Sequence, residues 1–376
     1  MGAIVRSRPP FRADHVGSLL RPKPLTEARR KFAAGTLGAE DLRRAEDKAV
    51  TSIVHMQEAV GLRGATDGEL RRNSWHMDFI YQLAGVSRAQ DSGQSYAFRT
   101  DSGETVISAQ GAIRVDGPIS LKQTIFGDAF RFLRDTVTTA VPKLTIPSPG
   151  VVFARTGRAL IDTKPYPDLN AFWDDLTKAY IEETKNLYEL GCRYLQFDDT
   201  SFAELCDEHE RERVQIRGDD PDAALEQYVT QLNRVLRSRP ADMAATVHTC
   251  RGNFRSAWGA EGGYDAVAER LFSELEVDGF FLEYDDKRSG GFEPLRFVRP
   301  GAVVVLGLVT TKRGELESKD DLKRRIDQAA RYLPLEQLCL SPQCGFASVD
   351  VGNNLTEDEQ RAKLALIVET AEEVWS

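Results

Sequence analysis

Eight short runs of apolar or β-branched residues recur along the chain, and each is followed by a cluster of polar or glycine residues. Two of them, VVVLGL and RYLQF, have almost no polar position, which is typical of strands buried on both faces of a sheet. The first two runs are short, and we count them as strands partly because the rest of the pattern requires them. The predicted strands are residues 15–16, 64–66, 143–146, 193–197, 244–247, 279–282, 303–308 and 337–340.

Between most of these runs, apolar residues recur every three or four positions, which predicts helices with one buried face. Segments 37–62 and 168–191 have this spacing and end near glycines, where helices commonly stop. Two further helices are expected over 318–333 and 356–375. In the last of these, Thr356 and Glu359 have the spacing of a capping box.

Alternation of strand and helix, repeated about eight times, predicts a parallel α/β protein. Eight units favour a (β/α)8 TIM barrel, with a doubly wound open sheet as the alternative. No GxGxxG motif opens a helix after the first strand, which weakens the dinucleotide-binding form of that alternative. Residues 86–125 depart from the alternation, and TVISAQGAIRVDGPIS within them predicts a β-hairpin inserted after the second unit. We expect residues 1–376 to form a single TIM-barrel domain.

Composition narrows the function classes. The chain has 376 residues, 41% of them hydrophobic and 28% charged, as in ordinary globular proteins. A net charge of −9 argues against nucleic acid as a partner, because phosphate binding needs a clustered positive surface. No apolar run approaches the length of a membrane span, and no secretory signal is visible. Five sparse cysteines do not resemble a disulfide framework, so we expect a cytoplasmic protein with no membrane partner.

The strongest local signal for chemistry is His248-Thr249-Cys250 after the fifth predicted strand. Alternate residues of an extended chain point the same way, so His248 and Cys250 can reach one ion together. Glu283 and Cys344 follow two other predicted strands, and strand ends converge on the carboxyl face of a barrel. One nitrogen, two sulfurs and a carboxylate form a tetrahedral zinc set. The alternative is that both cysteines are small buried apolar residues, as most free cysteines are.

A zinc ion with two thiolate ligands and a carboxylate would be a weak Lewis acid for water attack. It can still lower the pKa of an incoming thiol while leaving the sulfur nucleophilic, which favours S-alkylation over hydrolysis. A closed structural zinc site is the competing interpretation, although structural sites usually use closely spaced ligand pairs. Trp75 is a candidate pocket wall, but large aromatic residues more often belong to the core.

Six motifs, in this order, resemble the catalytic barrel of the cobalamin-independent methionine synthase family, over residues 11–375. The motifs are HVGS, TDGE, LQFDD, VHTC, FLEYD and SPQCG. The chain is most similar to the single-barrel members, which correspond to the C-terminal catalytic domain of the full-length enzyme.

The resemblance implies a zinc-dependent methyltransferase that converts homocysteine to methionine, like the 5-methyltetrahydropteroyltriglutamate–homocysteine enzyme. It implies zinc ligands His248, Cys250, Glu283 and Cys344. Ser18 and the backbone of Val16 and Gly17 would hold the carboxylate of homocysteine. Glu69 and Asp198 would be the catalytic pair that holds its ammonium group, unless they are salt-bridged to Arg71, Arg72 or Lys143.

The donor side departs from the family. The full-length enzyme has a histidine after its seventh strand that acts on the folate donor, and the matching stretch here is LGLVTTKRGE. Lys312 or Thr311 is the equivalent residue, so the donor could be a methylated folate, a methyl-corrinoid protein or another small molecule.

Three other functions stay open. An epoxyalkane–coenzyme M type of transferase uses a similar zinc but a sulfonate-bearing thiol, and Glu69 and Asp198 favour an amino acid instead. A non-enzymatic zinc-stabilised protein would have a closed site. A decarboxylase of the porphyrinogen type would not need the cysteines.

Overall fold

The computed structural model describes residues 6–89, 96–100, 102–108 and 112–376, and a curled sheet of seven parallel strands lies at its centre. The strands are neighbours in chain order, so each helical crossover leads to the next position in the sheet. All seven positions of β10 are buried, which explains its uninterrupted apolar sequence. The sheet comprises β1 (Gly64–Ala65), β6 (Val141–Pro147), β7 (Tyr194–Asp199), β8 (Ala244–Thr249), β9 (Gly279–Glu283), β10 (Val303–Val309) and β11 (Leu338–Pro342).

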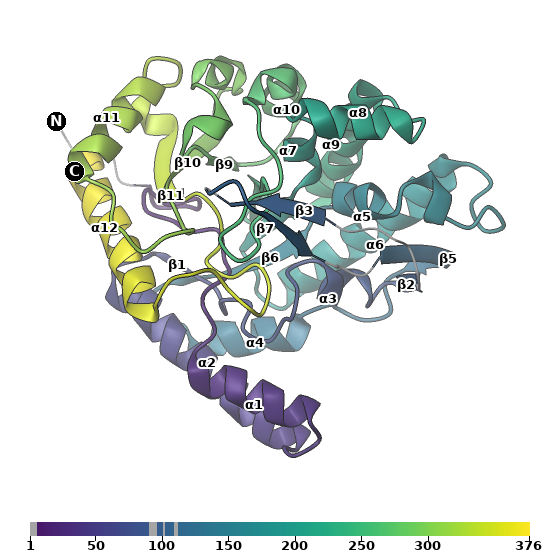
Figure 1. Cartoon of the computed structure of the whole chain (residues 1–376), viewed down its shortest axis with the longest axis horizontal. Coiled ribbons are helices and arrows are strands. Elements are labelled where there is room, and N and C mark those ends of the chain that lie inside the picture. Colours follow the sequence, from purple (N-terminus) through teal and green to yellow (C-terminus); the bar gives the residue numbers. More distant parts are fainter. Residues whose placement is uncertain (1–5, 90–95, 101, 109–111) are drawn as a thin grey trace.

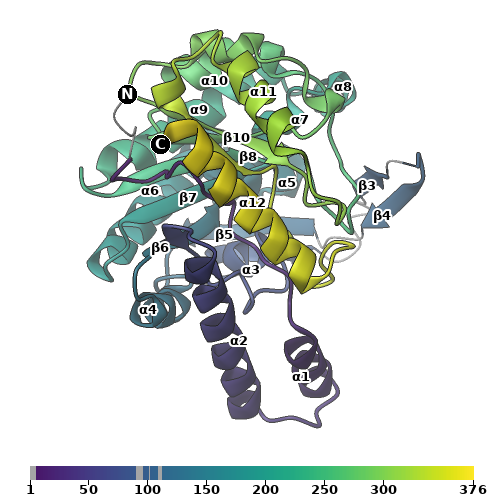
Figure 2. The ribbon, with the colours of Figure 1, turned by 90° about the vertical axis from the view of Figure 1, so that its left-hand side faces the viewer.

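Helices surround the outer side of this sheet (Figure 1). α2 contacts β1, α4 contacts β6, α11 contacts β10 and α12 contacts β11. Figure 2 shows α1 and α2 as a pair that projects from the body of the molecule. The helices are α1 (Lys23–Ala33), α2 (Ala39–Ala59), α3 (Met77–Ile80), α4 (Gly127–Thr136), α5 (Pro149–Thr156), α6 (Leu169–Glu189), α7 (Ser201–Glu204), α8 (Glu208–Ile216), α9 (Pro221–Ser238), α10 (Ala268–Glu274), α11 (Lys319–Ala329) and α12 (Glu357–Trp375). Within the described part of the chain, no helix combines the length and apolarity needed to cross a membrane.

The four predicted helices are present as α2, α6, α11 and α12, and local side-chain contacts fix the starts of two of them. The Asp168 side chain accepts hydrogen bonds from the first N–H groups of α6. At α12, Thr356 and Glu359 form the expected capping box. Short 3-10 turns complete the crossovers: η1 (Arg158–Leu160), η2 (Tyr264–Ala266), η3 (Lys287–Ser289), η4 (Glu293–Phe297) and η5 (Leu335–Gln337).

The first predicted strand, residues 15–16, is not one of the strands that the described structure contains. This segment is extended and pairs with β11 through a single parallel bridge between Ala13 and Leu340. On its other side, Lys143 of β6 donates a hydrogen bond to the carbonyl of His15 (2.5 Å) and pairs with Asp14 (3.3 Å). Polar side chains therefore replace part of the backbone ladder here. The curled seven-stranded sheet is consistent with a TIM-barrel-like fold.

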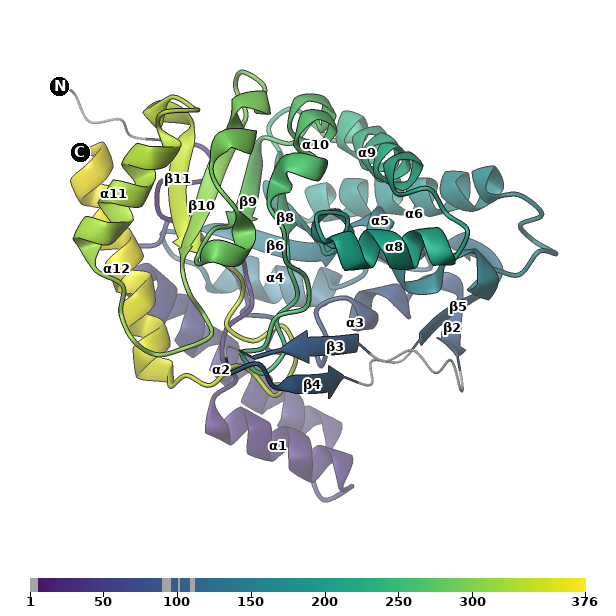
Figure 3. The same cartoon turned by 45° about the horizontal axis from the view of Figure 1, so that its top comes forward.

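The segment after β1 is antiparallel, but its two predicted strands do not pair with each other among the described residues. They are β4 (Thr105–Ser108), which pairs with β3 (Tyr96–Arg99), and β5 (Ala112–Ser120), which pairs with β2 (Ala84–Ala89). The turn expected between β4 and β5 lies outside the described residues. Figure 3 shows β3 and β4 apart from the central sheet, near the loops that follow its strands.

Glu183 of α6 gives a prediction for the pH dependence of stability. Its Oε2 accepts a hydrogen bond from the backbone of Ile125 (3.0 Å), and burial raises its pKa to about 8. Because the native state holds a proton that the unfolded chain releases near its ordinary pKa of 4.5, native stability should fall as pH rises from about 5 to 8. Glu183→Gln should therefore stabilise the protein by roughly 3–5 kcal/mol at pH 9 and little at pH 4.

Urea unfolding of both proteins at pH 4 and pH 9 measures this difference. Glu182→Gln is the matched control, because Glu182 is the neighbouring exposed carboxylate. Its charge raises the pKa of Glu183 less than burial does, so this variant should show a much smaller pH-dependent change than Glu183→Gln. Equal stabilities of wild type and Glu183→Gln at both pH values would mean that Glu183 is charged in the native state.

Candidate metal centre and adjoining pocket

Four side chains with metal-binding chemistry meet at the carboxyl ends of the sheet strands. His248 lies in β8, Cys250 follows β8 directly, Glu283 ends β9, and Cys344 lies just beyond β11. Their ligand atoms are all within 4.8 Å of one another, and all four residues are buried. Among the described residues, this is the single group of three or more His, Cys, Asp or Glu side chains that could hold a metal ion.

The donor atoms of this cluster are oriented by the backbone around them. The Cys250 and Cys344 sulfurs are 3.4 Å apart, too long for a disulfide bond of about 2.05 Å. His248 Nδ1 lies 3.3 Å from the Phe281 carbonyl, while its buried Nε2 has no hydrogen-bond partner among the described residues. The Arg251 N–H donates to Glu283 Oε1 (2.8 Å). Such backbone contacts commonly hold metal ligands in position.

The electrostatics of the cluster favour a cation between its four members. A hydrogen bond from Cys250 and the proximity of His248 hold the pKa of Cys344 well below its usual range. The same hydrogen bond raises the pKa of Cys250 well above its usual range. Burial lowers the pKa of His248, but the nearby Cys344 outweighs it and the pKa is about 9. Burial also raises the pKa of Glu283 to about 7. The four side chains thus perturb one another's pKa values strongly, and a bound cation would relieve the repulsion among their negatively charged forms.

Two zinc–sulfur bonds of about 2.3 Å at a tetrahedral angle would place the sulfurs roughly 3.8 Å apart. The two sulfurs are 3.4 Å apart, somewhat closer than that separation. All four donor atoms lie within 4.8 Å of one another, and His248 Nε2 has no hydrogen-bond partner in the described part of the chain, so the residues present fit a zinc ion.

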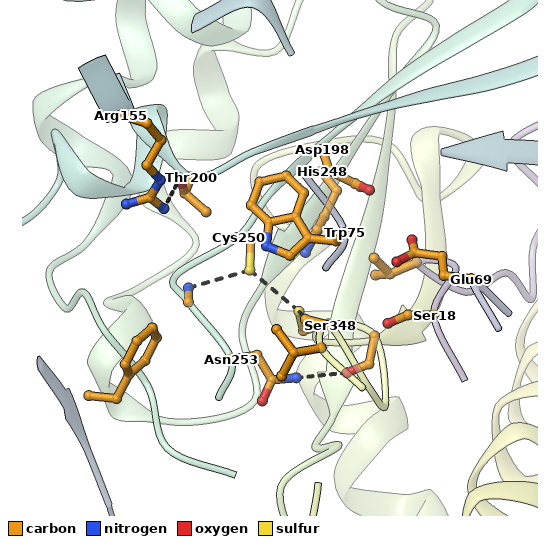
Figure 4. A pocket seen from close by; sticks show the side chains of 16 residues that line it. Ser18, Glu69, Trp75, Arg155, Asp198, Thr200, His248, Cys250, Asn253 and Ser348 are labelled. Carbon is orange, nitrogen blue, oxygen red and sulfur yellow. Dashed lines mark hydrogen bonds between the residues drawn. The ribbon is translucent and has the colours of Figure 1, made fainter. Parts of the chain in front are cut away.

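A pocket opens beside the cluster, and four of the five residues predicted to bind an amino acid, all but Gly17, line it. Val16, Ser18, Glu69 and Asp198 all contribute to its wall, together with His248 and both cysteines. In Figure 4, Ser18 and Glu69 lie on the opposite side of Cys250 from Arg155 and Thr200.

The segment that carries Ser18 depends on a glycine. A Cβ atom at Gly17, where φ is +151°, would lie 2.7 Å from Thr145 Cγ2. The Gly17 carbonyl also accepts a hydrogen bond from the Thr66 hydroxyl (2.6 Å). The HVGS motif therefore allows the chain to approach β6 closely, which brings Val16 and Ser18 to the pocket.

Glu69 has a strained backbone and a partly unsatisfied carboxylate. Its φ is +58°, and its N–H is held by Asp67 (2.9 Å). Thr145 donates to Oε1 (2.7 Å), and Arg72 lies 3.6 Å from the same oxygen. Oε2 is buried with no hydrogen-bond partner among the described residues. Strain of this kind is often concentrated at functional sites. The predicted alternative of an ion pair with Arg72 is thus present, but it involves only one carboxylate oxygen.

Among the described residues, Asp198 forms no ion pair within 4.0 Å with the predicted alternatives, since Lys143 pairs with Asp14 and Arg71 with Glu46 and Asp47. The charge of Lys143 is still near enough to lower the pKa of Asp198 to a small extent. Gln196 donates to Asp198 Oδ1 (2.7 Å), and burial raises the pKa of Asp198 to about 7. Glu69 contributes to that increase, so the two carboxylates are close enough to repel each other. A cationic group between them would relieve this repulsion.

Three pocket residues change the picture obtained from the sequence. Trp75 lines the pocket, as one of the two interpretations expected. Phe98 and Arg155 also line it, although neither was predicted from the sequence as a pocket residue. For Arg155, the sequence does contain a signal: a single arginine ends the apolar run VVFA, and such an arginine is buried only when its charge has partners. The structure shows that Arg155 is buried. Phe98 gave no such signal, because it lies in a short strand of the irregular segment.

Thr311 and Lys312, the two candidates for a donor-side group, have different surroundings. The Thr311 hydroxyl contacts Gln343 Oε1 (2.9 Å) and donates to the carbonyl of Gly345 (3.1 Å). Lys312 is buried with Nζ 3.6 Å from Asp285, and Nζ makes no hydrogen bond within the described part of the chain. The Lys312 ammonium group therefore has fewer hydrogen-bond partners among the described residues than the Thr311 hydroxyl has.

Fold and site together define a class: an α/β protein with a curled parallel sheet and a sulfur-rich candidate metal site beside a pocket with two carboxylates. Residues 11–373 match the family model described as the catalytic domain of cobalamin-independent synthase, and the chain belongs to that family. The family and its structural neighbours indicate a methyltransferase of the cobalamin-independent methionine synthase type.

Three similar proteins illustrate the relationship. YxjG of Bacillus subtilis, described as uncharacterized, is 46% identical, with 99% of this chain and 97% of YxjG covered. A Listeria monocytogenes structure, of a candidate vitamin-B12 independent methionine synthase, is 38% identical with a TM-score of 0.79, covering 99% of this chain and all of that one. A Shewanella B12-independent methionine synthase in complex with selenomethionine is 20% identical with a TM-score of 0.69, covering 96% and 97%. The last likeness concerns the fold alone.

Proposed function

We propose that this protein is a zinc-dependent methyltransferase that moves a methyl group to the thiol of homocysteine and produces methionine. The observation that carries the proposal is the juxtaposition of the His248, Cys250, Glu283 and Cys344 cluster with a pocket lined by two carboxylates. We further propose that the extended segment before Ser18 acts as the eighth strand of a (β/α)8 barrel.

Zinc would be held by His248 Nε2, the two cysteine sulfurs and the Glu283 carboxylate. When bound there, it would lower the pKa of a substrate thiol and keep the sulfur electron-rich, because two thiolate ligands and a carboxylate leave the site anionic overall. Glu283 is the ligand best suited to yield to the substrate, since its carboxylate also has the Arg251 N–H as a partner.

The acceptor amino acid would lie between Ser18 on one side and the Glu69–Asp198 pair on the other. Ser18 and the backbone of Val16 and Gly17 would hold the carboxylate, and the two acidic side chains would hold the ammonium. Glu69 Oε2, which has no hydrogen-bond partner among the residues that the structure describes, and the repulsion within the pair support a cationic partner there.

In the methyl transfer, the homocysteine sulfur forms a bond to the methyl carbon while the bond from that carbon to the donor breaks. The donor leaves with the electron pair of the broken bond, and the thiol proton is released. Holding both reactants in line supplies much of the rate. A methylated folate or a methyl-corrinoid would be the donor. Lys312 is buried beside Asp285 and does not line the pocket, so no residue is assigned as the donor-side acid.

The epoxyalkane–coenzyme M type of reaction is the alternative function, because the same four ligands could activate another thiol. Its substrate would bring a sulfonate next to Glu69 and Asp198, where like charges repel. An acceptor screen that compares homocysteine with 2-mercaptoethanesulfonate separates the two reactions.

Zinc X-ray absorption of the zinc-loaded protein tests the proposal. Adding homocysteine should increase the number of sulfur neighbours of zinc by one, since a substrate thiol joins the two cysteines. Homoserine, which has a hydroxyl in place of the thiol, is the control and should leave the sulfur count unchanged. An unchanged count with saturating homocysteine would indicate a closed structural site.

A further inference from the structure

The β3–β4 hairpin lies over the metal pocket and contributes one buried side chain to it. Along β3, Ala97 and Arg99 are exposed while Phe98 is only 8% exposed. Two of the four β4 residues, Thr105 and Ile107, are exposed as well, with Ile107 at 57%. A hairpin with so little buried surface is held in place by few contacts, and Phe98 is its main apolar anchor.

Backbone hydrogen bonds attach this hairpin to the loop that carries Cys250. The Arg99 N–H donates to the Trp258 carbonyl (2.7 Å), and the Trp258 N–H donates to the Arg99 carbonyl (2.9 Å). Arg99 also pairs with Glu261 (3.3 Å). The position of the hairpin therefore depends on the loop after β8, because Arg99 is bonded to two residues of that loop.

Two glycines make room for the Phe98 ring next to the metal cluster. A Cβ atom at Gly252 would lie 3.0 Å from Phe98 Cε1, and one at Gly259 would lie 3.5 Å from the same atom. The Gly252 N–H donates a hydrogen bond to the Cys250 sulfur (3.3 Å). Gly252 therefore contacts both the Phe98 ring and a proposed metal ligand. Phe254 also packs against Phe98, with ring centroids 5.4 Å apart.

Phe98 lines the part of the pocket that Arg155 and Thr200 also line, away from the residues proposed to bind the amino acid. The acceptor groups Ser18 and Glu69 are on one side of Cys250, while Arg155 and Thr200 are on the other (Figure 4). Phe98 lines both this pocket and the adjoining hollow that Arg155 and Thr200 share. In an in-line displacement the leaving group lies opposite the attacking sulfur across the methyl carbon, so the donor needs space beside the sulfur that the amino acid does not fill.

We propose that Phe98 is a specificity-determining residue that limits the size of the alkyl donor able to reach the acceptor sulfur. This inference rests on the proposed function. The ring fills the donor side of the pocket, so that a methyl carbon fits where a longer alkyl chain meets the aromatic wall. By covering this side, the ring also keeps water from the reacting sulfur.

Alkylation of homocysteine by methyl iodide and propyl iodide, with the zinc-loaded protein, tests the proposal independently of the natural donor. In each reaction a carbon–sulfur bond forms, iodide leaves with the electron pair, and the thiol proton is released. Product yields are measured by mass spectrometry, and the rate with the Cys344→Ser protein is subtracted as background. Phe98→Ala should raise the propyl-to-methyl rate ratio at least ~10-fold over wild type, because truncating a buried ring opens space for the longer chain.

Two further variants keep the test specific. Ile107→Ala, on the exposed strand of the same hairpin, should leave the ratio unchanged, and Phe98→Leu should give an intermediate ratio. Zinc content and the extra sulfur neighbour with homocysteine should be retained in Phe98→Ala. If Phe98→Ala shows the same propyl-to-methyl rate ratio as wild type, or no longer binds homocysteine, the inference about Phe98 is wrong but the proposed function stands. If wild-type protein does not accelerate alkylation at all, the proposed function itself fails and the inference with it.

Discussion

Cys344→Ser should abolish both metal binding and methyl transfer. The Cys344 sulfur lies 3.4 Å from that of Cys250, and a serine hydroxyl of nearly the same size is a poor zinc ligand at neutral pH. We expect zinc to fall from about one per chain to a small fraction, and methionine formation to fall by roughly 10³-fold or more, because the acceptor thiol loses its activation. Metal analysis and a methyl-transfer assay measure the two effects.

Cys192→Ser is the matched control for this variant. Cys192 is equally buried, and its thiol contacts the Tyr194 carbonyl at 3.5 Å, a partner that a hydroxyl can keep. It should retain zinc and activity, which separates loss of a ligand from loss of folding. A Cys344→Ser protein that binds no zinc but still makes methionine would remove Cys344 from the site.

Asp198→Asn should weaken the use of homocysteine without removing the metal. The amide keeps the shape of the side chain and an oxygen for Gln196, but it loses the charge that the substrate ammonium needs. Removing one partner of a buried charge pair costs about 2–5 kcal/mol, so we expect kcat/KM for homocysteine to fall by roughly 10²–10³-fold. Zinc content should stay at the wild-type level.

The thiol 4-mercaptobutyrate, which is homocysteine without its amino group, provides the control for this prediction. Wild type should use it poorly, and Asp198→Asn should cause little additional loss, since no ammonium is present to be recognised. If the variant loses activity equally with both thiols, Asp198 does not bind the ammonium and its effect comes from the metal site or the fold.

Much of the architecture follows from local patterns in the sequence. Period-3.6 apolar spacing predicts α6 and α12, and the uninterrupted run of β10 predicts a strand covered on both faces. These patterns succeed because each helix or strand buries a face that its own residues define. The segment at residues 15–16 is different, because its place beside β11 and β6 depends on Lys143 and on Ala13 meeting Leu340, which are contacts with distant residues.

The residues of the candidate site also fall into those that local sequence predicts and those that depend on distant contacts. His248 and Cys250 are two positions apart, so a strand alone directs both toward one point. The remaining ligands could be proposed because parallel strands end at the same edge of a sheet. Phe98, in contrast, comes from a hairpin whose position depends on two hydrogen bonds to Trp258, and no local spacing encodes such a contact.

Residues within a few positions of one another are enough to predict seven strands of the central sheet, four of the helices and the polar residues that follow the strands, because each of these features depends on near neighbours. The contact between Cys250 and Cys344, 94 residues apart, the pairing of β4 with β3 rather than β5, and the place of Phe98 in the pocket wall are visible only in the folded chain. The curvature of the sheet and the docking of the hairpin arise from packing among distant segments, which no short stretch of chain specifies.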